Sequence, residues 1–438
     1  MNTPPEIPVQ IPAVLLPKPG TDLRKWATIA CDQFTSEPEY WEQAAQLAGD
    51  APSTLNLILP EVYLGSPEEA HRVRDIRRTM QQYLDDQLFT ARNSFILVER
   101  TVGAKTRHGL MIALDLEMYD YHQGSQTLIR ATEGTILDRL PPRIRIRQGA
   151  ALELPHILVL IDDPAATVIE PLVAMSGSME PIYDFELMLG GGHLKGYVMD
   201  GPDIERHVLT ALGGLADPDT FRSRYAVGPD HGVLLFAVGD GNHSLATAKA
   251  LWEQMKPLAG MDHPARYALV EIGNIHDHGL EFEPIHRVLF DVREDVGRAM
   301  LRHFGDKLGL VPCADAEEMI AIVNRQDGPG QAVGYVDERG CSVARLHEPS
   351  CNLPVGTLQR FLDEWQAAGG FREIDYVHGT EVVTRLGRRP GNAGFYLTAM
   401  NKGDLFKTVI LDGALPRKTF SMGEALEKRF YMECRGIV

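Results

Sequence analysis

The residues with the clearest chemical potential lie in the segment Gly-Asp-Gly-Asn-His-Ser at 239–244. The apolar run before it predicts a buried strand over 232–241, and the alanine-rich pattern after it predicts a helix over 242–256. A strand that leads directly into a helix leaves the first amide N–H groups of the helix without partners. Such groups bind phosphate, helped by the positive end of the helix dipole.

Two interpretations of this junction follow from its residue types. In the first, Asp240 binds Mg²⁺ or orients a hydroxyl group, with His243 beside it, and the glycines let a ligand approach the backbone closely. The residues that would then contact the phosphates and their cofactor are Gly239, Gly241, Asn242 and Ser244. In the second, Asp240 or Asn242 only caps the helix, since both residue types are good N-caps. The pattern matches neither a Walker A loop nor G-x-G-x-x-G, so the residues alone leave both interpretations open.

The elements that must position this junction alternate along the chain. Strand-like segments are rich in apolar and β-branched residues, and the segment 154–162 predicts a fully buried strand. The segment 66–89 is an amphipathic helix with Ser66 as its N-cap and Pro67 in its first position, and 166–177 predicts a strand followed by a turn. This alternation, without internal repeats, predicts an α+β (mixed α/β) fold.

Composition and charge exclude several classes of protein. The chain has 438 residues, 44% of them hydrophobic, which is enough for sizeable cores and argues against disorder. Its 60 acidic and 43 basic residues give a net charge of −17, which repels a phosphate backbone and disfavours nucleic acid as a partner. Small anionic ligands stay compatible with this charge, because they need only one positive pocket.

The cysteines and the N-terminal segment indicate in which cellular compartment the protein is expected. The five cysteines are scattered without a C-x-x-C pair, which is typical of reduced thiols rather than of a disulfide framework or a zinc site. The first 20 residues show no signal-peptide pattern, and no apolar run is long enough to span a bilayer. We therefore expect a cytoplasmic protein that does not contact a membrane. Cys31 is expected to be a buried small side chain rather than a reactive thiol.

Three histidines in the segment 274–287 raise the alternative of a transition-metal site. His276 and His278 have the spacing of one strand face, and His286 follows shortly after. No further ligand completes a tetrahedral set by sequence. Solvated loop histidines are therefore the favoured interpretation.

Seven collinear stretches resemble a large bacterial family that is named as a domain of unknown function, number one thousand and fifteen. They include "GDGNHSLATAKA", which also resembles the signature of the ParB/sulfiredoxin superfamily. The stretches are 30–41, 129–150, 152–164, 183–197, 239–250, 374–379 and 415–435. The resemblance implies a ParB/sulfiredoxin-like nucleotide-binding unit embedded in the larger fold. Members of that superfamily include free-serine kinases, so ATP or ADP, or alternatively CTP, with Mg²⁺ is the implied cofactor.

The resemblance implies that 240–244 cradles the nucleotide phosphates, but one position departs from the superfamily pattern. Ser244 stands where a basic residue usually follows the histidine, so positive charge must come from elsewhere. Phosphoryl transfer depends on such cations and on a carboxylate near the acceptor. The candidate cations are Arg130, Lys195, Arg287, Arg417 and Lys418, and Lys195 stands out because three glycines precede it at 190–192.

The general base has two candidates. Glu133 is preferred by resemblance, since ParB-like kinases use a glutamate to take the hydroxyl proton, and Asp32 is the second choice. A carboxylate near the acceptor hydroxyl can orient it even when little proton transfer has occurred.

These observations predict a small-molecule kinase that transfers a phosphoryl group to a serine-like or polyol-like metabolite. The alternatives are a ParB-like nucleotide-gated switch that binds a protein partner, and a metabolite-binding protein without catalysis. We expect three lobes at 1–150, 151–290 and 291–438, with the nucleotide in the central one and "LPRKTF" at 415–420 returning to the site. A homodimer is left open.

Overall fold

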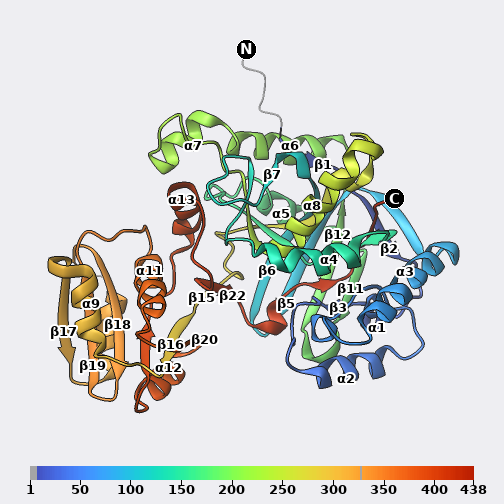
Figure 1. Ribbon diagram of the computed structural model, residues 1–438. Helices are drawn as coiled ribbons and strands as arrows, with labels where there is room; N and C mark the ends of the chain where they lie inside the picture. The colour runs from blue at the N-terminus through green and yellow to red at the C-terminus, as the bar shows by residue number, and fades with distance from the viewer. Residues whose placement is uncertain (1–6, 326–327) are drawn as a thin grey trace. The chain divides into compact units, whose positions relative to one another are not determined.

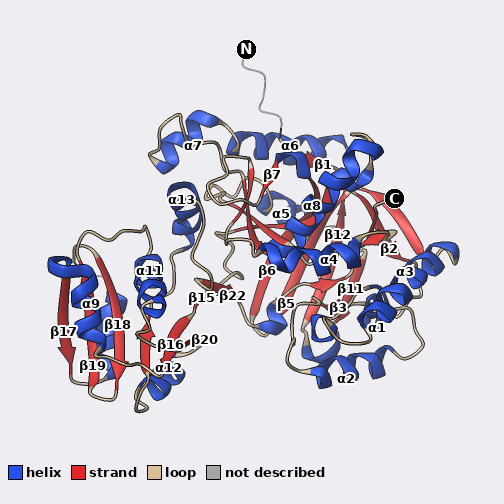
Figure 2. Ribbon diagram, viewed as in Figure 1, coloured by secondary structure: helices blue, strands red, loops and turns tan. Residues whose placement is uncertain are grey.

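The computed structural model describes residues 7–325 and 328–438 and has a mixed α/β fold, as predicted (Figure 2). The chain divides into two compact units. Unit 1 comprises residues 1–281 and 422–438, and unit 2 comprises residues 282–421. The sequence predicted three lobes, with boundaries near residues 150 and 290, and that division into three stays a prediction.

Unit 1 is built on a mixed ten-stranded sheet (Figure 1). The strand order is β11-β12-β5-β6-β14-β10-β13-β8-β7, and β1 pairs with β6. The strands are β1 Val9–Gln10, β5 Phe95–Val102, β6 Lys105–Asp115, β7 Tyr119–Asp120, β8 Ile129–Ala131, β10 Leu158–Ile161, β11 Tyr183–Glu186, β12 His193–Met199, β13 Phe236–Asp240 and β14 Tyr267–Asn274.

Helices and short strand pairs surround this sheet. The α-helices of unit 1 are α1 Leu23–Trp26, α2 Pro38–Ala48, α3 Glu69–Asp85, α4 Leu140–Arg147, α5 Glu170–Ser176, α6 Pro202–Leu215, α7 Pro218–Tyr225 and α8 Asn242–Ala259. The remaining strands are β2 Ala13–Pro17 with β4 Phe89–Asn93, β3 Thr28–Ile29 with β23 Phe430–Tyr431, and β9 Leu152–Glu153 with β24 Arg435–Gly436.

Strand β5 shows why the sheet is buried on both faces. Ile96 and Val98 belong to one hydrophobic core, which also holds Trp26 and Met80, while Phe95 and Leu97 belong to a second core. Alternate side chains of a strand point to opposite faces, so an unbroken apolar run supplies both cores at once. The second core includes residues of α8, which places that helix on the second face.

Unit 2 contains a six-stranded sheet of order β17-β19-β18-β21-β16-β20 and the small pair β15-β22. Its strands are β15 Phe282–Pro284, β16 His286–Phe290, β17 Leu308–Cys313, β18 Gln331–Asp337, β19 Gly340–Leu346, β20 Glu373–Val377, β21 Ala393–Tyr396 and β22 Phe420–Met422. Its helices are α9 Val296–Phe304, α10 Ala316–Arg325, α11 Pro354–Ala367, α12 Thr380–Gly387 and α13 Lys402–Asp412.

Two predicted elements differ from the structure. Helix α3 begins at Glu69, and Ser66 lies one turn earlier, where its carbonyl accepts from the Glu69 N–H and its side chain caps nothing. The segment 166–177, predicted as a strand, contains α5 instead. The Asp163 carboxylate accepts the backbone N–H of Thr167 and Val168 and so bends the chain. Proline in the first helical turn then favours a helix, because it lacks the N–H that a strand ladder uses.

Candidate functional site

The turn between β13 and α8 requires its two glycines. Gly241 adopts a left-handed conformation with φ +78°, and a Cβ there would lie 3.0 Å from Ile157 Cγ1. A Cβ on Gly239 would lie 2.9 Å from side-chain carbons of Leu160 and Met422. Side chains at either position would therefore push the chain away from its neighbours, and the sharp strand-to-helix turn depends on their absence.

Neither Asp240 nor Asn242 caps α8. The residue before the helix is Gly241, which has no side chain, and Asp240 Oδ1 accepts the N–H of the adjacent Gly241 at 3.0 Å. The Asn242 side chain forms hydrogen bonds outside the helix: its Oδ1 accepts the Thr132 N–H at 3.2 Å, and its amide donates to the Val238 carbonyl at 3.3 Å. Among the residues that the structure describes, the backbone N–H groups of Asn242 and His243 meet no acceptor. They are available to an anion.

A lysine from the C-terminal segment lies beside this turn. Lys428 Nζ is 3.3 Å from Asp240 Oδ2, and the Lys428 side chain is only 13% exposed. A partly buried cation next to a helix N-terminus favours bound phosphate. Lys428 thus provides, beside the turn at 239–241, the positive charge that Ser244 does not supply.

Asp32 is a second carboxylate of the same cluster. Its Oδ1 accepts from the Gln33 amide at 3.0 Å, and its Oδ2 lies 3.8 Å from His156 Nε2. Burial disfavours the charged form, but His156, the Gln33 hydrogen bond and Lys428 together lower the pKa of Asp32 below its ordinary value. Asp32 is therefore ionised at neutral pH and can accept a hydrogen bond from a hydroxyl group.

His243 lies in electropositive surroundings. Burial, followed by the charges of Arg143 and Arg139, lowers the pKa of His243 to about 4. Its Nε2 faces the Ile136 N–H at 3.4 Å. A neutral imidazole whose pKa is lowered by two nearby guanidinium groups indicates a place with positive potential, which suits phosphate oxygens.

Ser244, His156 and Tyr431 are joined by side-chain hydrogen bonds. Ser244 Oγ lies 2.9 Å from His156 Nε2, and Tyr431 Oη lies 2.8 Å from His156 Nδ1. Tyr431 Oη also accepts the Cys31 N–H. Both ring nitrogens of His156 are therefore engaged, and the imidazole holds the Ser244 hydroxyl and the Tyr431 phenol in fixed positions.

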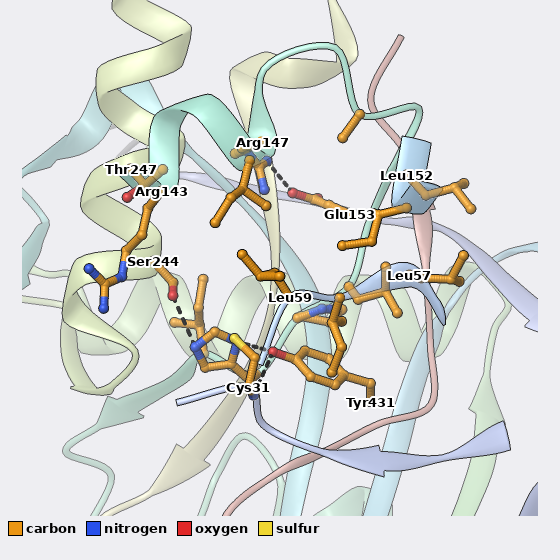
Figure 3. Close-up of a pocket in the computed structure, with 18 of the residues that line it drawn as sticks. Cys31, Leu57, Leu59, Arg143, Arg147, Leu152, Glu153, Ser244, Thr247 and Tyr431 are labelled. Atoms are coloured by element: carbon orange, nitrogen blue, oxygen red, sulfur yellow. Dashed lines mark hydrogen bonds and ion pairs between the residues drawn. The ribbon is translucent and has the colours of Figure 1, made fainter. Parts of the chain in front are cut away.

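A cavity of about 150 Å³ lies behind this histidine. In Figure 3, Ser244, Tyr431 and Cys31 lie at its polar end, and dashed lines join Ser244 and Tyr431 to the imidazole between them. Burial and the charge of Asp32 raise the pKa of the Cys31 thiol well above its ordinary value, so it stays protonated. Cys31 thus lines the cavity as a half-buried side chain, and it is more exposed than the expectation of a buried small side chain.

Two of the other predicted cations, Lys195 and Arg130, do not join this cluster. Four strands separate Lys195 on β12 from β13, a span of roughly 24 Å at the usual spacing, and Lys195 Nζ pairs with Asp184 at 3.3 Å. The Arg130 guanidinium is buried and donates to the carbonyls of Thr127, Gly232 and Val233. Arg287, Arg417 and Lys418 belong to unit 2, where Arg287 is fully buried and donates to Gln359 and to backbone carbonyls.

Glu133, the preferred base, lies near the junction through its chain neighbour. Thr132 is bonded to Asn242 and donates its hydroxyl to the Val238 carbonyl at 2.6 Å, so the backbone at Glu133 runs beside the start of α8. The role of Glu133 stays a prediction.

Several residues of the cluster were not identified from the sequence. The cations Arg139, Arg143 and Lys428 and the hydrogen-bonded pair His156 and Tyr431 all lie within stretches that carry the family resemblance, namely 129–150, 152–164 and 415–435. The signal that could have found them is their membership of those stretches. Nothing in local spacing distinguishes Lys428 from Lys418.

The alternative of a transition-metal site finds no support in the geometry. His276 is paired with Asp162, its Nε2 lying 2.7 Å from Oδ1, and His286 belongs to unit 2. Across residues 7–325 and 328–438, no three His, Cys, Asp or Glu side chains gather as a metal site would require. Within the same ranges, no helix is long and apolar enough to cross a membrane.

Comparisons with solved structures give distant likenesses. A mutant free serine kinase in complex with AMP is 11% identical, with a TM-score of 0.39 over 74% of this chain and 90% of that chain. A mutant free serine kinase in complex with ADP is 11% identical, with a TM-score of 0.39 over 76% and 94%. A conserved hypothetical protein from Pyrococcus furiosus is 13% identical, with a TM-score of 0.36 over 75% and 94%. A shared function does not follow from identities and TM-scores this low.

Sequence comparison identifies the family. No curated protein matches the chain. The model of one protein family matches residues 15–365, which is most of the chain, and this confirms the resemblance to the family though not the wider kinship with ParB and sulfiredoxin. The chain belongs to the family described as "Protein of unknown function (DUF1015)".

Proposed function

We propose that this protein is a small-molecule kinase that binds the phosphates of a nucleotide at the start of α8. One observation carries the proposal: the free amides of Asn242 and His243, the carboxylates of Asp240 and Asp32, and the Lys428 ammonium converge on one strand-to-helix turn. Phosphoryl transfer is chiefly positioning and electrostatic stabilisation, and these are the groups that it needs.

Each group has a role in the proposed reaction. The two amides donate to phosphate oxygens, and Lys428, with Arg139 nearby, offsets the negative charge. Asp32, ionised through its neighbours, accepts a hydrogen bond from the acceptor hydroxyl. The hydroxyl oxygen forms a bond to the transferred phosphorus, and the bond from phosphorus to the nucleotide's bridging oxygen breaks. The hydroxyl proton passes to Asp32, or to Glu133 as the family resemblance implies.

The donor set fits Mg²⁺ in one mode. Mg²⁺ usually keeps water ligands and binds one or two carboxylates together with substrate phosphates, so it does not need a cage of protein groups. Asp240 would be the protein ligand. The ion, when bound with the nucleotide, would neutralise charge on the phosphates.

The first test is nucleotide binding by thermal shift, with AMP, ADP, ATP and CTP, each with and without Mg²⁺. A nucleotide at one hundred times its dissociation constant stabilises the folded state by about 2.7 kcal/mol. We expect Asp240→Asn to lose the Mg²⁺-dependent part of the shift while its own melting stays cooperative. The matched control is Asp184→Asn, which removes the carboxylate beside Lys195 and should leave binding unchanged. The absence of any shift with all four nucleotides would contradict the proposal.

The second test is nucleotide consumption in the presence of hydroxylated metabolites. A kinase consumes nucleotide only when an acceptor is present, and Asp240→Asn should reduce that rate by a factor of 100 or more, in the range seen when a group that stabilises the transition state is removed. Slow consumption that ignores every acceptor would support a nucleotide-gated switch instead. Tight binding of metabolites without any consumption would support a non-catalytic protein.

A further inference from the structure

The cavity beside Ser244 is large and mostly apolar, and the reaction described above does not use it. Its apolar wall comes from segments that are far apart in the sequence, and its members include Leu57, Leu59, Ile76, Met80, Ile146 and Leu152. Most of these side chains also belong to the first hydrophobic core of unit 1. The cavity is therefore a half-open pocket whose apolar wall is continuous with this core.

The size of the cavity indicates what it can hold. A cavity of about 150 Å³ lined by leucine and isoleucine holds a molecule the size of benzene. Native interiors contain few voids larger than a water molecule, because each lining atom loses its dispersion contacts across an empty space. An apolar opening of this size is well filled by a hydrocarbon group of about six carbons and poorly filled by water.

The charges in the cavity wall are matched within the protein. Arg143 pairs with Glu61, and Arg147 pairs with Glu153, which also accepts from Arg435 at 2.6 Å (Figure 3 shows the pair of Arg147 and Glu153). A carboxylate or ammonium group that entered the cavity would be desolvated without gaining a new partner. The cavity therefore selects an uncharged group.

The polar end of the cavity adjoins the proposed reaction site. Ser244 is the third residue of α8, directly after the two free amides, and His156 lies between Ser244 and Asp32. A ligand that fills the cavity and extends past this histidine would bring its polar end to the Asp32 carboxylate.

We propose that the cavity binds the apolar end of the phosphoryl acceptor, so that the substrate is a hydroxylated molecule with an uncharged hydrocarbon group of about six carbons. This inference rests on the proposed kinase function and sharpens it, because a free amino acid such as serine, or a polyol, would leave the cavity unfilled. The occupant is a small molecule whose hydroxyl faces Asp32 and whose hydrocarbon group faces Met80 and Ile146.

The test measures binding of a series of 1-alkanols, from 1-propanol to 1-decanol, to the full chain without nucleotide, by ligand-observed NMR. Each added methylene that enters the cavity should lower the dissociation constant about fourfold, the equivalent of about 0.8 kcal/mol, until about 1-hexanol. Beyond that length the affinity should stop rising. Affinity that rises equally through 1-decanol would indicate surface partitioning and overturn the inference, as would the absence of binding.

Two variants place the binding in the cavity. Ala150→Leu adds carbon atoms to the wall and should weaken 1-hexanol binding tenfold or more, while Ala211→Leu, on α6 and against the other core, should not. Met80→Ala enlarges the cavity and should move the affinity optimum to longer alkanols, an effect that a misfolded protein would not show. An optimum that stays at the same length in Met80→Ala would overturn the inference.

Nucleotide binding separates failure of this inference from failure of the proposed function. If nucleotides bind but alkanols do not, the kinase proposal stands and the acceptor inference is wrong. If alkanols show the length optimum but no nucleotide binds, the cavity binds a hydrocarbon ligand. The proposal that this ligand accepts a phosphoryl group is then wrong.

Discussion

Two glycine-containing turns of unit 1 present a charged residue that could meet a phosphate, and their surroundings differ. At 239–241 the neighbours come from distant parts of the chain: Lys428 from the C-terminal segment, Asp32 from the N-terminal segment and Thr132 from the end of β8. At 190–192 the lysine that follows is matched by Asp184 on the adjacent strand of the same hairpin.

Packing and backbone conformation explain the glycines of the second turn without a ligand: Gly190 has φ +73° and open space around it. A Cβ on Gly191 would overlap the Phe430 ring, and one on Gly192 would overlap the Thr101 carbonyl. The comparison teaches that glycines next to a cation do not define a ligand site. A site arises where the fold brings charges from separate segments to a turn whose amides are still free.

The largest expected effect comes from removing a buried ion pair that anchors the C-terminal segment, which carries Lys428. Arg429, next to Lys428, pairs with both Glu271 and Glu433, and the side chains of all three are at most 4% exposed. Glu271→Gln should lower the free energy of unfolding by about 3–5 kcal/mol, because it removes a carboxylate that balances the guanidinium charges of Arg429 and Arg107 in the interior.

Chemical denaturation of this variant should be compared with that of Glu281→Gln. Glu281 pairs with Lys105 on the surface, where both side chains are more than a third exposed, so its loss should cost at most about 1 kcal/mol. Equal losses in the two variants would mean that the buried pairs do not anchor the segment.

The next effect concerns the two turns themselves. Gly241 and Gly190 both have positive φ, +78° and +73°, but only Gly241 has neighbours where a Cβ would be. Gly241→Ala should destabilise the fold by about 2–3 kcal/mol, since backbone strain adds to the contact with Ile157. Gly190→Ala should cost only the strain, about 1 kcal/mol. Thermal or denaturant unfolding of both variants measures the difference, and a larger loss at Gly190 would contradict the packing at Gly241.

The lysines provide a comparison in binding. Lys428→Met should raise the dissociation constant of the bound nucleotide about 10- to 100-fold, the usual worth of a charge-assisted hydrogen bond. Lys195→Met removes the same charge from the other turn and should change the constant less than twofold. Titration calorimetry at fixed ionic strength gives both values. A Lys195 effect as large as that of Lys428 would break the distinction between the turns.

The last effect, which is spread over a range of pH, is a pH dependence at His243. Because its pKa is about 4 in the folded protein and 6.5 in a model peptide, the unfolded chain binds the proton first as the pH falls. The stability that the neutral imidazole contributes is complete above pH 6.5 and declines between pH 6.5 and 4. His243→Gln should flatten the decline of the unfolding free energy over this window. Parallel curves for the two proteins would show that His243 is not held neutral.

The sequence predicted the local parts of this site well. The strand, the glycine turn and the helix over 236–259 follow from apolar runs, punctuation and periodicity, all of which act over a few residues. The mixed fold class followed in the same way. Segment 166–177 was mispredicted because an apolar run of this length suits either a strand or a short helix, and the Asp163 carboxylate decides between them.

What the sequence could not provide was the set of partners around the turn. Lys195 and Lys428 are the same residue type, and only the sheet order and the return of the chain at Met422 separate their roles. The choice of Lys195 followed a local cue, the three glycines. The match between Lys195 and Asp184 depends on the register of the β11–β12 hairpin, which a single sequence does not reveal.

The division of unit 1 into two sequence segments has a consequence for biosynthesis. Everything between Glu281 and Met422 is translated before Lys428, Arg429 and Glu433 leave the ribosome. At about 5–20 residues per second, this interval is on the order of ten seconds. During it, Asp240 exists on a nascent chain that lacks Lys428, and Glu271 has Arg107 but not Arg429 as a partner. The turn at 239–241 therefore gains its full set of charges only at the end of translation, and a chain released early would carry the glycine turn without the lysine beside it.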